Sequence, residues 1–369
     1  MEKIRKVTIQ DVARYANVSV GTIDRVIHNR GKVSPEKRKK VEEAIEKLNF
    51  NPNLLARTLA LGNQFTVCIL IPAAPSEGHY WSMPLNGLEM GSAQFKDYGI
   101  ITQYFFYDLF DEKTFTQQTA KILEINPDGV ILAPLFLNES KLFTEKLKDK
   151  EIPFVFIDAD IPNRQSLSYI GPDVKQSAYI AGRLMNSILP EKAEILIVNM
   201  VKGFDNASAL KRMEEGFRAY FKEHGQEQNK HITTLTIKSK QKDEVFRELT
   251  KYYIKNPAVK GVFVTNSKAY LVSEFHQNHD LDIRLLGYDL VEGNINHLKS
   301  GGIDVIISQS PVQQGQRAVQ TLFEFFIQKQ EPEKILHVPL DIIIRENMGF
   351  YIGFNRQHRT EIKTTTVNN

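Results

Sequence analysis

The chain has 369 residues, a length that predicts two or three structural units with a large core. Hydrophobic residues make up 42% and charged residues 25%, as is usual for soluble globular proteins. The single cysteine, Cys68, excludes a disulfide framework and a multi-cysteine zinc site. It lies in an apolar run, so we expect a small core residue. No apolar run approaches the roughly 18 residues of a membrane span, and no signal-peptide pattern opens the sequence. We therefore expect a cytoplasmic protein without membrane contact.

The net charge of +3 is unevenly distributed along the chain. Residues 1–62 carry 13 Lys and Arg against 7 Asp and Glu, whereas the remainder carries 34 against 37. A small basic module therefore precedes a mildly acidic bulk. This pattern predicts that only the N-terminal part meets nucleic acid, which would associate the protein with the nucleoid.

The basic module is predicted to contain helices over residues 8–16, 20–27 and 35–48. Their apolar residues recur at helical spacing and should share a core: Ile9, Val12, Ala13, Ala16, Ile23, Val26, Ile27, Val41, Ala44, Ile45 and Leu48. Two short helices joined by a tight turn and supported by a third describe a helix-turn-helix, whose second helix enters the DNA major groove. The alternative is a small helical bundle that binds no DNA.

Local residues fix the predicted helix ends. Thr8, Ser19 and Ser34 stand where helix-capping hydroxyls are preferred. Pro35 suits the first position of a helix, and Asn17 tolerates the left-handed conformation that closes one. The second helix should therefore begin directly after Ser19.

The sequence here resembles the lactose/galactose repressor (LacI/GalR) family. The matching motifs are Val7–Ala13, Val18–Ser19, Thr22–Val26 and Leu48–Asn53, in one register over about sixty residues. The resemblance implies that three positions of the second helix face DNA bases, namely Val20, Gly21 and Arg25. An arginine can bond guanine O6 and N7 together, whereas valine offers only an apolar contact and glycine none.

The resemblance also implies residues that touch the DNA backbone and position the domain. These expected DNA contacts are Thr8, Ser19, Thr22, His28, Lys32, Ser34 and Asn53. Asp24 stands where the family usually has serine. It either orients Arg25 through an ion pair or faces solvent, and the sequence does not decide between these alternatives.

Residues 52–63 are predicted to be a hinge. They form a helix-competent stretch that is too short to be stable alone in water. In the family that the chain resembles, this helix forms when two subunits pair on the operator, and paired leucines wedge into the minor groove. Leu59 occupies the wedge position with Ala60 beside it. The alternative is an ordinary linker.

From residue 64 onward, short apolar runs alternate with amphipathic segments, which predicts two consecutive α/β lobes with parallel sheets. The predicted strands are 66–73, 101–107, 129–134, 153–158, 194–200, 232–238, 261–265, 283–288, 304–308 and 336–344. The predicted helices are 83–98, 114–125, 139–150, 177–189, 207–225, 243–256, 268–279 and 312–328. Residues 169–173 should cross between the lobes. This organisation resembles the periplasmic-binding-protein (type 1) sugar-receptor fold.

Four motifs at predicted strand ends should converge on one cleft between the lobes, because parallel sheets bind ligands at the carboxyl ends of their strands. The cleft residues expected from these motifs and the neighbouring segments are Tyr80, Trp81, Asp158, Asp160, Asp173, Arg212, Asn266, Asp289 and Gln309. Asp289, Asn266 and Gln309 suit a polyol through their hydrogen bonds, and an aromatic ring such as that of Trp81 can stack on a sugar. Core, turn and capping roles are the alternatives.

Two departures put a simple pentose or hexose in doubt. Many relatives have an Asp-Arg pair where this chain has Asp158-Ala159, and sugar-binding relatives usually have arginine where this chain has Met213. Arg212 lies one residue earlier, about 100° around a helix. It either reaches the cleft or is a solvated charge.

The predicted protein is a ligand-responsive repressor of carbohydrate-related genes, composed of an all-α helix-turn-helix domain (1–51), a hinge (52–63), a two-lobed α/β effector domain (64–355) and a polar, disordered tail (356–369). We expect a homodimer on near-palindromic operator DNA, with a small-molecule effector and neither cofactor nor metal. The alternatives are an exported sugar receptor, an enzyme, or a regulator that answers to a nucleobase or a protein co-effector. Nucleophile-elbow, P-loop and His-x-x-x-His patterns are missing from the sequence, which argues against an enzyme.

Overall fold

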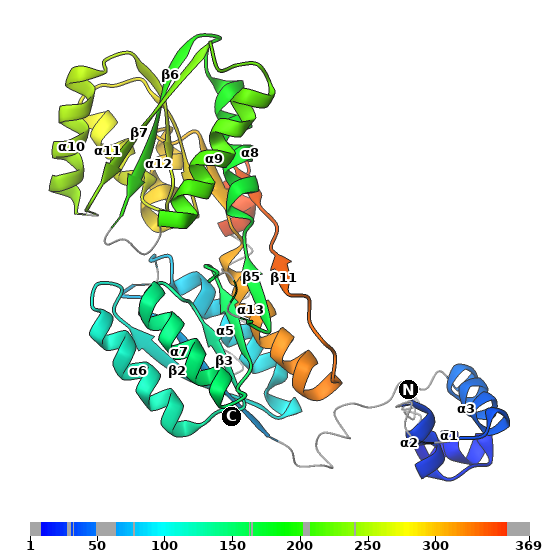
Figure 1. Cartoon of the computed structure of the whole chain (residues 1–369). Coiled ribbons are helices and arrows are strands. Elements are labelled where there is room, and N and C mark those ends of the chain that lie inside the picture. Colours follow the sequence, from blue (N-terminus) through cyan, green and yellow to red (C-terminus); the bar gives the residue numbers. More distant parts are fainter. Residues whose placement is uncertain are drawn as a thin grey trace. The chain divides into compact units, whose positions relative to one another are not determined.

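The computed structural model describes residues 9–27, 31, 33–48, 64–76, 78–161, 163, 165–201, 207–239 and 241–352 (Figure 1). The chain divides into an N-terminal unit, residues 1–63, and a second unit that contains nearly all the rest. The predicted hinge (52–63) and tail (356–369) lie outside the described residues.

The N-terminal unit contains α1 (Ile9–Ala16), α2 (Val20–Ile27) and α3 (Pro35–Lys47). Their apolar faces meet in one core, in which Val12, Ile23 and Val41 are 0% exposed. Burial of such side chains drives the packing, because each removes apolar surface from water. The predicted helix-turn-helix is confirmed, and the predicted core is confirmed for the residues whose side chains are described.

The C-terminal end of α1 and the N-terminal end of α2 follow the predicted capping. Asn17 adopts φ 53° and closes α1 in the left-handed region. The Thr22 amide donates to Ser19 Oγ at 3.3 Å, so Ser19 caps α2.

The predicted capping bond at α3 is wrong. Ser34 holds the N-cap position in an extended conformation, but its hydroxyl makes no capping hydrogen bond. Its backbone carbonyl accepts from the Arg38 amide at 3.0 Å, and the ring of Pro35 pre-sets the first turn. The helix therefore starts where predicted without the hydroxyl.

The first lobe of the second unit is a fully parallel sheet with strand order β11-β5-β4-β3-β1-β2. Its strands are β1 (Phe65–Pro72), β2 (Ile100–Tyr107), β3 (Gly129–Leu132), β4 (Phe154–Ile157), β5 (Ser168–Gly171) and β11 (Ile335–His337). Its helices are α5 (Ser82–Phe95), η1 (Lys96–Tyr98), α6 (Glu112–Ile125), α7 (Leu137–Asp149), α13 (Pro311–Phe323) and η2 (Glu324–Gln328).

Helices α5 and α13 cross closely because small residues face each other there (Figure 1). A Cβ atom at Gly87 would lie 1.9 Å from the Val312 carbonyl oxygen, and one at Gly315 would lie 2.3 Å from that of Pro84. Neither position tolerates a side chain without moving a helix. This contact holds α13, which follows β10 of the second lobe in sequence, on the first lobe.

The second lobe has the strand order β12-β10-β9-β8-β6-β7, in which only β12 runs antiparallel to its neighbour. Its strands are β6 (Ala193–Met200), β7 (Lys230–Ile237), β8 (Val259–Val264), β9 (Arg284–Tyr288), β10 (Val305–Ser308) and β12 (Asp341–Ile343). Its helices are α8 (Val174–Ile188), α9 (Ala207–Glu223), α10 (Lys242–Lys255), α11 (Ala269–Asn278) and α12 (Glu292–Ser300). Helices pack on both faces of this sheet. The predicted pair of similar α/β lobes is confirmed.

Two predictions for individual elements are wrong, and one helix was not predicted. The single strand predicted over 336–344 is two strands, β11 in the first sheet and β12 in the second. Pro339 lies between them and has no amide hydrogen for a sheet ladder. Residues 168–171 form β5 within the first sheet, and the crossing follows them. Helix α12 was not predicted, because its nine residues bury only Asn294 and Leu298 and carry little apolar periodicity.

Candidate functional site

Helix α2 presents the predicted base-reading residues on its open side. Val20 is 42% exposed, and Gly21 and Arg25 are exposed as well. The opposite side of α2 buries Ile23 and Val26 in the core. The guanidinium of Arg25 is therefore available to a groove of DNA without disturbing the packing of the domain.

Two predicted phosphate-contacting hydroxyls meet at the start of α2. Ser19 Oγ and Thr22 Oγ1 lie 3.0 Å apart, at the helix end whose amides and dipole favour anions. Ser34 is exposed before α3. The predicted DNA contacts Thr8, His28, Lys32, Asn53, Leu59 and Ala60 lie outside the described residues.

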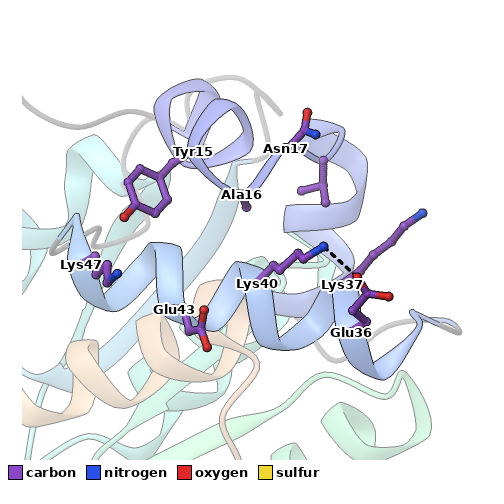
Figure 2. Close-up of a pocket in the computed structure, with 9 residues that line it drawn as sticks. Tyr15, Ala16, Asn17, Glu36, Lys37, Lys40, Glu43 and Lys47 are labelled. Carbon is purple, nitrogen blue, oxygen red and sulfur yellow. Dashed lines mark hydrogen bonds and ion pairs between the residues drawn. The ribbon is translucent and has the colours of Figure 1, made fainter.

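A pocket that the sequence analysis missed lies between the end of α1 and α3 (Figure 2). It encloses 360 Å³ and is lined by Tyr15–Val18 together with charged residues of α3. Lys40 Nζ lies 2.7 Å from Glu36 Oε1 across one helical turn, and such exposed pairs contribute little stability. No residue of α2 lines this pocket, so we assign it no part in base reading.

The second candidate site lies where strand ends of the two lobes meet. Asp158 follows β4 of the first lobe, and Asp289 and Gln309 follow β9 and β10 of the second. The hydroxyl of Tyr80 donates to Asp158 Oδ1. The amide and the side-chain nitrogen of Gln309 donate to Asp289 Oδ1 and Oδ2, each at 3.1 Å. The structure thus brings four predicted residues into two hydrogen-bonded pairs, one on each lobe.

Both aspartates adopt the left-handed region, with φ 69° for Asp158 and φ 62° for Asp289. This conformation is uncommon for residues other than glycine, and strained backbone of this kind clusters at functional sites. In both cases it turns the chain directly after a buried strand. The carboxylates thereby leave their strands at equivalent places in the two lobes.

Burial controls the protonation of these carboxylates. It raises the pKa of Asp158 to about 6, opposed by the hydrogen bond from Tyr80. It raises the pKa of Asp289 to about 7, opposed by the bonds from Gln309 and reinforced by the charge of Asp158. Burial raises the pKa of Tyr80 well above its usual range. The negative charges of Asp158 and Asp289 raise it further. The two carboxylates therefore share one electrostatic environment across the lobes.

Asp289→Asn should change the pH dependence of stability. Because the folded pKa of Asp289 is raised to about 7, the folded state binds its proton more tightly than the unfolded chain does. This contribution is fully present at low pH and is lost as the pH rises from about 4 towards about 7. Asparagine does not titrate, so the variant does not lose this stability as the pH rises. The difference in unfolding free energy, variant minus wild type, should increase by on the order of 1 kcal/mol between about pH 5 and about pH 8.

Denaturant titrations at several pH values would measure this change. Asp149→Asn on the exposed end of α7 is the matched control and should show no such trend. A constant difference for Asp289→Asn across the range would contradict the raised pKa.

Asp160, Asp173 and Arg212 form a neighbouring group. Asp173 caps α8 by accepting from the amides of Lys175 and Gln176, each at 3.1 Å. Arg212 lies 3.9 Å from Asp173 Oδ1. Burial raises the pKa of Asp160, and the charge of Arg212 opposes that shift. The adjacent Met213 is only 6% exposed in the core of the second lobe. Helix α9 therefore turns Arg212 towards these two carboxylates.

Two predicted residues are engaged in local structure. Asn266 donates to the Met200 carbonyl at 2.9 Å and accepts from the Lys268 amide at 3.0 Å, so both ends of its amide hold the turn after β8. Trp81 is 3% exposed and packs edge-on against Tyr80 with ring centroids 5.3 Å apart. Trp81 thus supports the ring of Tyr80. A contact of either residue with a ligand stays a prediction.

Two features of this site were not predicted. The hydroxyl of Tyr169 donates to the carbonyls of Asp158 and Pro172, at 3.3 and 3.1 Å. The Glu292 amide donates to the Gly78 carbonyl at 3.3 Å and joins the first lobe to α12. A Cβ at Gly78 would lie 2.6 Å from Glu292 Oε2, so glycine permits this approach. Tyr169 belongs to a motif visible in the sequence, whereas Gly78 gives no sequence signal of its contact.

Within the described ranges, no group of three or more His, Cys, Asp or Glu side chains is placed to hold a metal ion. In the same part of the chain, no helix is both long and apolar enough to cross a membrane. Cys68 is a buried free thiol in β1, and burial raises its pKa to about 11. Burial keeps this thiol protonated, in line with its predicted core role.

Two family models match the chain in separate segments. The model described as bacterial regulatory proteins, lacI family, matches residues 8–53. The model described as periplasmic binding protein domain matches residues 69–330. These ranges correspond to the described helix-turn-helix and to most of the two lobes.

Individual proteins give the same division. Catabolite control protein A of Staphylococcus xylosus is 44% identical over 96 residues, which are 26% of this chain and only 29% of that protein. The ribose operon repressor of Lactococcus lactis is 25% identical over 92% of this chain and 98% of its own length. A solved structure titled a putative LacI transcriptional regulator from Bacteroides fragilis has 30% identity and TM-score 0.71, and the match covers 78% of this chain and 100% of that one.

A solute-binding protein from Burkholderia graminis, solved in complex with D-arabinose, shares the fold of the two lobes. It has TM-score 0.67 and 17% identity, with 78% of this chain and 96% of that chain covered. At that identity the likeness concerns the fold alone.

Proposed function

Because the chain belongs to the LacI family of bacterial transcription regulators, we propose that it binds a near-palindromic operator as a homodimer and that a sugar-like effector seated between its lobes changes its affinity for that DNA. Repression of carbohydrate-related genes is the proposed outcome. A regulator that binds operator DNA acts in the cytoplasm, and association with the nucleoid is part of this proposal.

One observation carries the proposal. A helix-turn-helix with an exposed Arg25 is joined in one chain to two α/β lobes whose strand ends place Asp158 and Asp289 in a common environment. The first feature would supply a DNA contact, and the second would supply polar groups from two lobes to one ligand. Such a combination couples two binding sites when a ligand favours one arrangement of the lobes.

The proposed coupling works through lobe closure. A ligand that bonds the Tyr80–Asp158 pair and the Asp289–Gln309 pair together favours the closed arrangement. It shifts the equilibrium only by its difference in affinity for the two arrangements. In a dimer, closure would change the spacing of the segments that lead to the DNA-binding domains. Whether the ligand releases or strengthens DNA binding is decided by experiment.

Leu59→Ala should reduce bending of the operator. The family resemblance assigns Leu59 the role of a wedge that unstacks a central base step and opens the minor groove. Alanine has too little side chain to fill an opened step, so the bend angle should fall. Circular-permutation gel shifts would measure it, with Leu142→Ala on the exposed face of α7 as control. A bend equal to that of the wild type would remove the wedge assignment.

The proposal is tested by selecting DNA from a random pool with the full-length protein. The selected sites should show two half-sites related by approximate two-fold symmetry, as a dimer requires. Operator affinity is then measured by fluorescence anisotropy at several salt concentrations and should fall steeply with salt, because phosphate contacts release counterions. Asymmetric or random selected sites would refute it.

The other candidate functions have weaker support. An exported sugar receptor would share the lobes but has no use for the helix-turn-helix. We propose no catalytic role, since the relatives found are regulators and receptors. A nucleobase or a protein co-effector in place of a sugar remains an outcome of the ligand screen described in the Discussion.

A further inference from the structure

The two lobes each contribute a carboxylate, Asp158 directly after β4 and Asp289 directly after β9. Asp158 is half-buried, and Asp289 is 2% exposed. The Gly78–Glu292 hydrogen bond holds the lobes together beside it. Asp158 and Asp289 act on each other electrostatically across the lobe boundary.

The hydrogen-bond donors on these carboxylates are neutral. Tyr80 donates a hydrogen bond to Asp158, and Gln309 donates two to Asp289. Among the ion pairs of the described residues, none involves Asp158 or Asp289. The guanidinium of Arg212 lies beside Asp173 and acts on Asp160. Ala159 and Met213 occupy the positions where the family resemblance leads one to expect arginines.

Two like charges withdrawn from water are costly unless a cation accompanies them. Neutral donors offset only part of that cost. Consistent with this, the pKa of both carboxyls is raised, to about 6 and about 7. Among the residues that the structure describes, no Lys or Arg pairs with either of these two acceptors, which come from different lobes.

We infer that the effector carries a protonated amine on a hydroxyl-rich frame, with the ammonium between Asp158 and Asp289. This inference rests on the proposed function, because it assigns a chemical class to the same effector site. The ammonium would bond both lobes at once and thereby favour their closure. The hydroxyls of the frame would bond Gln309 and the second oxygen of Asp158.

The surroundings suit such a ligand better than an anion or a purely neutral polyol. The hydroxyls of Tyr80 and Tyr169 lie at Asp158, the first bonded to its carboxylate and the second to its backbone carbonyl. A phosphate or carboxylate ligand would face Asp158, Asp160 and Asp289 together. A neutral polyol would satisfy hydrogen bonds but would leave both carboxylates without a counter-charge.

Matched ligand pairs test the inference with the full-length protein. Calorimetry or thermal shift would compare D-glucosamine with D-glucose and D-galactosamine with D-galactose, with N-acetyl-D-glucosamine as the uncharged amide and ammonium chloride as the bare cation. At least one amino sugar should bind about 10- to 100-fold more tightly than its neutral partner, the range of a charge-assisted bond. Ammonium chloride alone should have no comparable effect.

The variants Asp158→Asn and Asp289→Asn keep the side-chain shape and remove one charge each. Each should lower affinity for the amino sugar about 10-fold or more and leave affinity for the neutral partner within about 3-fold. Asp149→Asn, on the exposed end of α7, is the matched control and should leave both affinities unchanged.

The pH dependence gives a second readout. Protons compete with the ammonium for the carboxylates, so affinity for the amino sugar should rise with pH through about 6 to 7. The other described titratable or charged groups around the pair are Asp160, Arg212, Tyr80, Tyr107, Tyr169, Tyr288 and His79. Burial raises the pKa of each of these tyrosines, so they stay neutral in this range. A dependence that survives in both Asn variants would arise from another group and would count against the inference.

The possible failures are distinguishable. If neutral sugars bind as tightly as amino sugars, or if no amino sugar of the panel binds, the inference is overturned. The proposed function still stands if the protein selects symmetric operator sites and some ligand changes that affinity. Loss of selective operator binding would instead overturn the proposed function.

Discussion

Arg25→Ala should abolish the preference for operator over random DNA while leaving weak, salt-sensitive binding. Arg25 is exposed on α2, and its guanidinium is the only base-reading group of the three predicted positions that can donate paired hydrogen bonds. A paired arginine–guanine contact discriminates by about 1–3 kcal/mol, which weakens binding about 5- to 150-fold in each half-site. Two half-sites in a dimer would double that free energy.

Anisotropy titrations with operator and scrambled duplexes at two salt concentrations would measure the change. The slope of affinity with salt should persist, because it arises from the phosphate contacts. Arg14→Ala is the matched control: it removes an arginine whose side chain is 77% exposed on α1. It should change both duplexes equally. Undiminished operator preference in Arg25→Ala would show that base reading lies elsewhere.

Asp289→Ala should leave operator binding of the free protein intact but remove its response to the effector. Asp289 belongs to the second lobe, whereas the DNA-binding residues belong to the separate N-terminal unit. The substitution removes the acceptor that Gln309 holds with two hydrogen bonds, and with it a buried carboxylate of the second lobe. The loss of a charged hydrogen-bond partner should weaken effector binding by about 1.5–3 kcal/mol.

The effector needed for this measurement comes from a thermal-shift screen of sugars, amino sugars, sugar phosphates, sugar acids, polyols and purines. Binding to the folded state raises the melting temperature by mass action. Operator affinity is then titrated with the ligand found. Asp289→Asn guards against a folding defect, since it leaves no cavity, and Asp149→Ala is the surface control. A full response in Asp289→Ala would place the ligand elsewhere.

The sequence predicted the elements whose stability is local. Helices α1 and α2 were predicted because Ser19 and Asn17 mark their ends and because apolar residues recur on one face. The buried strands were predicted because parallel strands covered on both faces are continuous apolar runs. For the same reason the two lobes and the strand-end positions of Asp158 and Asp289 followed from the pattern.

The features that were missed depend on contacts between distant segments. The carbonyl of Gly78 meets the amide of Glu292 only once both lobes are folded. Residues 336–344 look like one strand because nothing local says that β11 and β12 join different sheets. The orientation of Arg212 towards Asp173 depends on which face of α9 packs on the sheet, which is set by Met213 and Phe217 in the core.

The placement of β11 and β12 also governs the order in which the chain can fold during synthesis. The first sheet pairs β5 with β11, whose residues lie more than 160 positions apart, as Ser168 and Glu333 illustrate. The second sheet closes only when β12 has been made. Neither lobe has its full set of strands until residues 335–343 have left the ribosome. Until then the first lobe exposes an unpaired edge at β5. Folding of this chain should therefore be slow and largely post-translational, and nascent chains should engage chaperones.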